Sequence, residues 1–211
     1  MTDVKCDCNI RFWWQNAPMN MRRDNQEIAC QQVLVEDSSV FSVQWSLFPA
    51  QIAAGLTARQ LLDRYLAYIR RATLSAIRPS ESATGVEFRL LGSRLSLISF
   101  LPPEEGDGAV TLRICGGLLV QSHQCDRGEL RFAVEPTPEG VKASLQLSDY
   151  CPLILGSSAP SPVRRWLYRL TQAAIHRLVT IRFLMLLYRD LAGSSAPIRV
   201  VNVNVRSGRP V

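Results

Sequence analysis

The sequence predicts an α+β domain in which an antiparallel sheet of about six to seven strands curves around a long C-terminal helix. Between Val86 and Asp149, segments of alternating apolar and polar residues are separated by short turns, which is typical of an antiparallel meander. A helical apolar pattern of about 30 residues then runs from Pro162 to Ala192. An apolar content of 47% with 20% charged residues is that of a globular protein, so we expect residues 28–193 to form one domain.

The N-terminal part of the chain predicts a leader followed by two strands. Residues 1–27 show no sustained period, and we expect their Phe12-Trp13-Trp14 cluster to dock on the domain in preference to a partner. An apolar run over 28–36 predicts the first strand. Over 40–48 the chain alternates, which predicts a strand with one buried face (Phe41, Val43, Trp45, Leu47) and one face in water (Ser42, Gln44, Ser46).

A helix and five strands follow. Thr57 and Gln60 form a capping box, which predicts a helix from there to about Ile77. Turn residues then separate strands expected at 86–91, 94–101, 110–120, 129–135 and 141–149. The pair Gly116-Gly117 indicates a bulge or a sharp bend within the third of these strands. In the last hairpin we expect one buried face, made of Leu130, Phe132 and Val134 opposite Val141, Ala143, Leu145 and Leu147.

The C-terminal helix is predicted to bury one continuous apolar stripe, with Gly193 ending the helix: Val163, Trp166, Leu167, Leu170, Ala174, Leu178, Ile181, Met185 and Tyr188. Arg177 falls on this stripe, where a charge needs a partner. His176 falls on the opposite side, so we expect it to be exposed. In the tail, 194–211, alternating valines at 201, 203 and 205 indicate a possible edge strand.

This order of elements resembles the START-like, or SRPBCC, helix-grip family, which includes lipid-transfer domains and polyketide cyclases. The resemblance covers about Val40 to Ala192, and the hairpin over 128–147 followed by the long helix carries most of it. It implies a bent sheet that grips the C-terminal helix and an elongated cavity between them for an apolar ligand.

The charge and the cysteines limit the partners and the location. The net charge of +6 comes almost wholly from arginine. Because no aromatic and basic module accompanies the scattered arginine pairs, nucleic acid is not expected, whereas contact with an anionic membrane surface stays open. No secretory signal or membrane-spanning run is recognised, so we expect a cytoplasmic protein whose six cysteines are free thiols.

No cofactor or metal is predicted. Cys6, Cys8, His123 and Cys125 could in principle supply metal ligands, but no closely spaced pair of metal-binding cysteines is present. No phosphate-binding loop or hydrolase motif is found either, and no catalytic residue is assigned.

We therefore expect the protein to bind or transfer an apolar or amphipathic small molecule, similar to a lipid or a polyketide. The candidate ligand-binding residues are Trp45, Phe88, Phe132, Leu145, Trp166 and Arg177. Arg177 could hold an anionic ligand head, pair with a carboxylate of the protein, or reach solvent at the helix edge. A cyclase-type enzyme using the same cavity and a partner-binding protein using its basic surface are the alternatives.

Overall fold

The computed structural model describes residues 26–121, 128–156, 161–168, 172–193 and 197–210. The elements follow one another as β1 (Gln26–Leu34), β2 (Val40–Phe48), α2 (Ala50–Ala53), α3 (Ala58–Ala72), β3 (Ile77–Ser82), β4 (Gly85–Leu90), β5 (Ser96–Phe100), β6 (Glu104–Gly106), β7 (Ala109–Gly116), β8 (Glu129–Thr137), β9 (Gly140–Tyr150), the 3-10 helix η2 (Leu153–Leu155), α4 (Pro162–Tyr168), α5 (Ala174–Ala192), β10 (Ile198–Asn202) and β11 (Arg209–Pro210).

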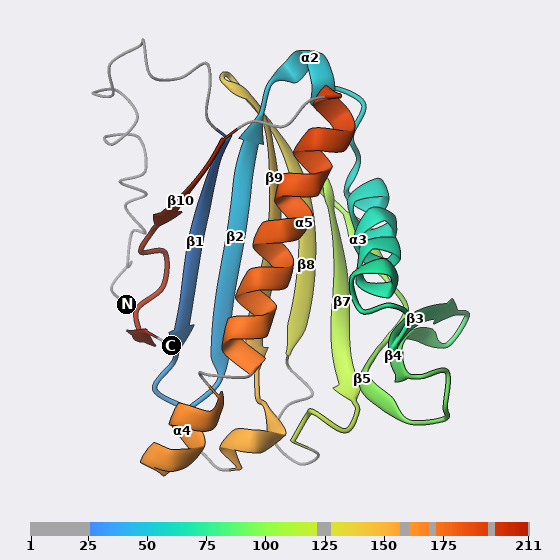
Figure 1. Ribbon diagram of the computed structural model, residues 1–211, viewed down its shortest axis with the longest axis vertical. Coiled ribbons are helices and arrows are strands. Elements are labelled where there is room, and N and C mark those ends of the chain that lie inside the picture. The colour runs from blue at the N-terminus through green and yellow to red at the C-terminus, as the bar shows by residue number, and fades with distance from the viewer. Residues whose placement is uncertain (1–25, 122–127, 157–160, 169–171, 194–196, 211) are drawn as a thin grey trace, which may run out of the picture.

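The fold is α+β, with one large curved, open sheet and a C-terminal helix, as Figure 1 shows. The strand order is β10-β1-β2-β9-β8-β7-β5-β4-β3, and the short strands β11 and β6 pair with β1 and β7. Eleven strands exceed the six to seven predicted. The sheet is also mixed, because β10 pairs with β1 in parallel. This arrangement is compatible with a helix-grip fold.

The hydrophobic core lies between the sheet and two helices. In Figure 1, α5 runs along one face of the sheet and α3 lies beside it. The ring of Tyr65 from α3 contacts those of Phe132 from β8 and Phe183 from α5, with both ring centroids 5.2 Å away. Aromatic rings at this separation add to the stabilisation from apolar burial. The sheet, α3 and α5 therefore meet at Tyr65.

The helix α3 begins as predicted and ends five residues early. The Thr57 hydroxyl accepts from the Gln60 backbone N–H, and the Gln60 side chain accepts from the Thr57 N–H, which confirms the capping box. The prediction that the helix continues to about Ile77 is wrong. Leu74 and Ser75 adopt positive φ angles of 51° and 63°, which turn the chain out of the helix. The following residues form β3 instead.

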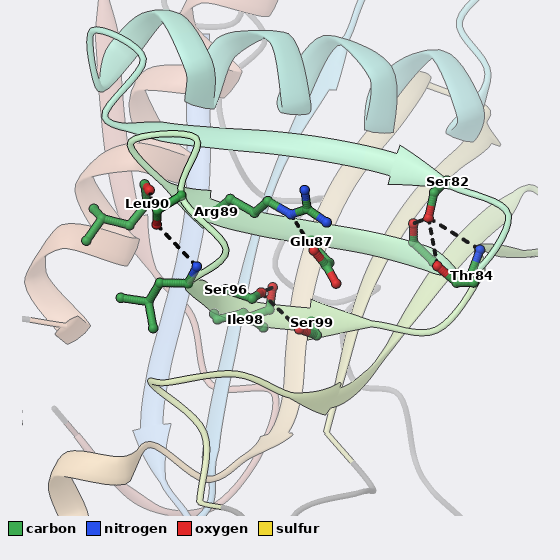
Figure 2. Close-up of polar contacts among 11 residues, drawn as sticks. Ser82, Thr84, Glu87, Arg89, Leu90, Ser96, Ile98 and Ser99 are labelled. Carbon is green, nitrogen blue, oxygen red and sulfur yellow. Dashed lines mark hydrogen bonds and ion pairs between the residues drawn. The ribbon is translucent and has the colours of Figure 1, made fainter.

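The strands β3, β4 and β5 form one side of the sheet, and local polar contacts lie along β4 and along β5. Figure 2 shows the Arg89 guanidinium beside the Glu87 carboxylate and the Ser99 hydroxyl donating to Ser96. Here β3 is an edge strand, and Pro79 within it has no N–H to offer to another strand.

Within the range of the predicted single helix the structure describes two helices, α4 and α5, and the stripe predicted to be buried is only partly so. Its residues Ile181 and Tyr188 pack against the core, whereas the side chains of Leu167 and Leu170 lie outside the described part of the structure. Within α5 the buried residues are Thr180, Phe183, Leu184 and Leu187. The stripe residues Val163, Trp166 and Leu178 are 71%, 61% and 56% exposed. The physical reason is that α5 is apolar on nearly all sides around residues 183–187, so its periodicity does not define one inward face.

The face of β2 that was expected to meet water is buried beneath α5, and the opposite face is covered too. On that outer face, Val33, Phe41 and Val43 form a small second apolar cluster. The segment after β10 packs there, because the Gln31 side-chain oxygen accepts from the backbone N–H groups of Val205 and Arg206 at 2.7 and 2.9 Å. Both faces of this hairpin are therefore covered, which alternation alone cannot reveal.

One cysteine differs from the expectation of six free thiols. Cys30 and Cys115 are free, whereas Cys151, directly after β9, is disulfide-bonded. The partner sulfur lies outside the described residues. The prediction of free thiols is therefore wrong at Cys151. Among the helices of the described chain, none combines the length and apolar character needed to cross a bilayer.

Candidate functional site

A strip of buried polar side chains lies on the side of β1 and β2 that faces α5. In the antiparallel register, Cys30 is opposite Gln44 and Gln32 is opposite Ser42. Directly opposed residues project to the same face, and Ile28 of this face belongs to the core beneath the helices. We call the following set the polar strip: Gln26, Gln32, Ser42, Gln44 and Ser46.

One end of the polar strip is bonded to α5. The Gln26 amide nitrogen donates to the Leu184 backbone oxygen at 3.1 Å and lies 3.4 Å from the Ser46 hydroxyl. Ser46 in turn donates to the Glu27 backbone oxygen at 2.8 Å. These bonds join the start of β1 to the middle of α5, so the helix is positioned by polar contacts as well as by apolar packing.

The centre of the polar strip is only partly hydrogen-bonded. The Gln44 amide nitrogen donates to the Ser42 hydroxyl at 2.8 Å and to the Cys30 sulfur at 3.6 Å. The Gln44 amide oxygen is fully buried and has no partner, and exchanging the two ends of the amide would leave the nitrogen unpaired in its place. Leaving such a group unsatisfied costs ~1–3 kcal/mol.

A second unpaired group lies diagonally across the two strands. The Gln32 amide nitrogen is buried without a partner. Gln32 lies two residues after Cys30, which is opposite Gln44, and therefore projects to the same face of the sheet. Diagonal neighbours of this kind are ~7–8 Å apart, which is within reach of long side chains such as those of glutamine. The strip thus offers one free acceptor and one free donor towards the helices.

Side chains of three helices complete the surroundings. Burial raises the pKa of Tyr65 in α3, and hydrogen bonding with Thr180 of α5 partly offsets this effect. Burial likewise raises the pKa of Tyr168 in α4, and the Gln32 side chain nearby partly offsets this effect. One turn before Thr180 on α5, burial lowers the pKa of His176 to about 4, so its imidazole is neutral at pH 7.

The groups named at this site are neutral hydrogen-bonding groups: amides, hydroxyls, a thiol and an uncharged imidazole. Around them lie the apolar side chains of the core. Such a set matches a ligand with an apolar body and a neutral polar group, since a charged ligand group would be left without a countercharge among them.

Three of the residues predicted to bind a ligand lie on the core side of the sheet. Phe132 and Leu145 are opposite each other on β8 and β9, and both are buried. Phe88 packs against the core from β4, with its ring centroid 5.5 Å from that of Phe100. Their role as ligand contacts stays a prediction.

The other three predicted residues are not brought to this side. Trp45 belongs to the outer cluster, where the Lys142 ammonium lies 5.4 Å from its ring centroid. Trp166 is mostly exposed on α4. Arg177 is at the helix edge, where its guanidinium donates to the Asn202 side-chain oxygen of β10 at 3.2 Å. The structure therefore gives Arg177 a neutral partner and a partly exposed position.

Sequence reasoning missed Gln44 and His176, because in both cases the wrong face of the strand or helix was expected to be buried. Gln44 was assigned to water because polar residues alternate with large apolar ones on its strand. His176 was assigned to the outside, yet four- and three-residue steps place it in line with Thr180 and Phe183, which are buried. The sequence did contain one signal, because polar residues recur on both of the consecutive strands β1 and β2.

A metal site is not indicated within the described ranges. No group of three or more His, Cys, Asp or Glu residues there could hold an ion. Of the candidate ligands from the sequence, Cys6, Cys8, His123 and Cys125 all lie outside the described residues.

The sequence matches no protein-family model and no curated protein. Among solved structures, CalU16 from Micromonospora echinospora is similar in two determinations, each 12% identical to this chain. Its solution NMR structure gives a TM-score of 0.39 over 82% of this chain and 78% of that one. Its crystal structure gives 0.31 over 80% and 96%. Both TM-scores lie below 0.5.

Proposed function

We propose that this protein binds an amphipathic small molecule between the sheet and α5, with the ligand's neutral polar group on the polar strip. The observation that carries the proposal is the fully buried, unpaired amide oxygen of Gln44. Native proteins rarely leave a buried polar atom without a partner, and a bound ligand is one way in which it is satisfied.

The unpaired amide nitrogen of Gln32 supports the same conclusion. It provides a donor beside the free acceptor of Gln44, on the same side of the same two strands. A hydroxyl or an amide on a ligand both donates and accepts, so one such group matches both atoms. The apolar body of the ligand then packs against core side chains such as Phe132 and Leu145.

The location agrees with the one that the helix-grip resemblance implied, between the sheet and the C-terminal helix. The chemistry of the ligand differs from the earlier hypothesis of an anionic head held by Arg177. Because Arg177 bonds with Asn202 at the sheet edge, we propose a neutral hydroxyl, carbonyl or amide as the recognised group.

The proposal is tested with the double variant Ser42→Ala/Gln44→Leu. It removes the unpaired oxygen together with the hydroxyl to which Gln44 donates, and among the described residues the only acceptor left without this donor is the weakly accepting sulfur of Cys30. We expect the empty protein to keep its free energy of unfolding or to gain ~1 kcal/mol. Native mass spectrometry of protein purified from its own host should show a bound small molecule that this variant no longer carries.

The matched control is Gln146→Leu, which changes a glutamine on the outer face of β9 and should leave the bound molecule in place. Two results would contradict the proposal. Either the wild-type protein carries no small molecule and binds none, or the double variant is less stable than the wild type by ~2 kcal/mol or more, which would mean that Gln44 is satisfied within the protein.

A further inference from the structure

One end of the molecule exposes several large apolar side chains. Figure 1 shows α4 and the first turns of α5 at this end. The 3-10 helix η2 packs against α4, and the Leu153 N–H donates to the Leu119 oxygen at 2.8 Å, which places the loop after β7 beside η2. We call the exposed residues here the apolar end: Leu118, Leu153, Val163, Trp166, Ile175 and Leu178.

These side chains are arranged on helical faces rather than scattered. Val163 and Trp166 are three residues apart on α4, and Ile175 and Leu178 are three apart on α5, so each pair shares one face. Single exposed apolar residues are normal on protein surfaces. A tryptophan, two branched aliphatic residues and leucines gathered at one end are typical of an interaction surface.

The charge of the chain is concentrated in the same part of the sequence. Residues 150–189 contain six arginines and no aspartate or glutamate: Arg164, Arg165, Arg169, Arg177, Arg182 and Arg189. Subtracting these six from the 24 basic residues leaves 18, which balances the 18 acidic residues of the remaining chain. The net charge of +6 is thus equal to the charge of this segment.

Beyond the apolar end, the exposed face of α5 carries arginines. Arg182 is seven residues after Ile175, so it lies on the same face, and it is exposed, as is Arg189 seven residues later. None of the ion pairs found within the described residues involves Arg164, Arg182 or Arg189. These guanidinium groups are therefore available to an anionic partner.

We infer that the apolar end docks on the surface of an anionic phospholipid bilayer. An apolar face that contains tryptophan and is bordered by unpaired arginines matches the boundary between lipid acyl chains and anionic headgroups. Val163, Trp166, Ile175 and Leu178 enter the acyl boundary, while Arg164 and Arg182 contact phosphate groups. The inference is independent of the polar strip, because it uses only outward-facing residues.

The experiment is sedimentation of the full chain with vesicles of phosphatidylcholine, either alone or with about one third phosphatidylglycerol. We expect binding to the anionic vesicles, at least tenfold weaker binding to the neutral ones, and loss of binding as salt is raised. The variant Val163→Ser/Trp166→Ser should weaken anionic binding by roughly tenfold or more. Because both side chains are exposed, we expect the variant to fold as the wild type does.

The matched control is Leu91→Ser/Leu95→Ser, which removes two exposed leucines from the turn between β4 and β5 and should bind as the wild type does. Equal binding by both double variants, equal binding to neutral and anionic vesicles, or no vesicle binding would overturn the inference. A wild-type dimer that Val163→Ser/Trp166→Ser dissociates, without vesicle binding, would also overturn it and would assign the surface to a second copy. Salt-dependent binding to RNA without vesicle binding would do the same in favour of nucleic acid.

Discussion

The position of His176 predicts that the protein loses stability as the pH falls from about 6.5 to about 4. An unperturbed histidine has a pKa of 6.5, whereas burial lowers that of His176 to about 4. Between these values the unfolded chain binds a proton that the folded protein excludes. The stabilising contribution is therefore complete above pH 6.5 and is lost as the pH falls through this interval.

The size of the effect follows from the pKa difference. At about 1.4 kcal/mol per pH unit, the interval between a pKa of 6.5 in the unfolded chain and a pKa of about 4 in the folded protein corresponds to ~3.4 kcal/mol at full protonation and to ~2 kcal/mol at pH 5. His176 keeps partial contact with solvent, so these values are upper limits. A loss of ~1–2 kcal/mol between pH 8 and pH 5 is a large fraction of the stability of a domain.

The assay is urea unfolding of the wild type and of His176→Gln at pH 8, 6 and 5. The variant removes the titrating group, so its free energy of unfolding should fall less steeply with acidification than that of the wild type. NMR gives a direct check, because His123 and His176 are the only two histidines in the chain. Two results would contradict the burial of His176. Its imidazole could titrate near pH 6.5, or the free energies of unfolding of the wild type and of His176→Gln could show the same pH dependence.

Three further predictions concern α5 and the cysteines. Leu184→Ala should lower the free energy of unfolding by ~3 kcal/mol, because Leu184 is fully buried. The exposed Leu178 is the control, since Leu178→Ala should change this free energy by less than ~0.5 kcal/mol. Urea unfolding compares the two variants, and similar losses would contradict the orientation of α5. Arg177→Met should shift the unfolding free energy by less than ~0.5 kcal/mol, since its hydrogen bond to Asn202 is exposed, and a loss of ~3 kcal/mol would instead show a buried carboxylate partner. Alkylation in urea without reductant should leave Cys151 unmodified, and mass mapping that finds it modified would contradict the disulfide.

The sequence predicted well those elements whose local chemistry has one interpretation. Thr57 and Gln60 mark the start of α3 because a capping box satisfies two backbone N–H groups at a helix start. In the β8–β9 hairpin, Phe132 and Leu145 are buried opposite each other as the alternation indicated. In both cases residues close in sequence are sufficient to define the structure.

Elements that depend on distant parts of the chain were predicted less well. The face of β2 with Ser42 and Gln44 is buried only because α5 covers it, and Phe41 on the other face is covered by the segment that contains Arg206, whose guanidinium lies 5.4 Å from the Phe41 ring. Alternation shows that a strand has two unlike faces, but it does not show which one meets the core when both are covered.

The site that we propose lies where the order of elements led us to expect one, but its chemistry differs from the expectation. A site between the sheet and the C-terminal helix was expected from the order of elements. Gln44 could not be identified, because an unpaired buried oxygen is recognised only when every possible partner is placed. His176 was misplaced because a helix that is apolar nearly all round has no period from which to assign its inward face.

The pairing of β1 with the last strands has a consequence for the order in which this protein forms during synthesis. β1 precedes the other described strands in the sequence, yet it pairs on one side with β10 and β11, which leave the ribosome after all of those strands. Until residues 198–210 emerge, the N–H and C=O groups along that side of β1 lack the strands with which they pair in the folded protein, and such an edge can associate with other chains. A nascent chain stalled before Ile198 should therefore be the form of this protein that most needs a chaperone.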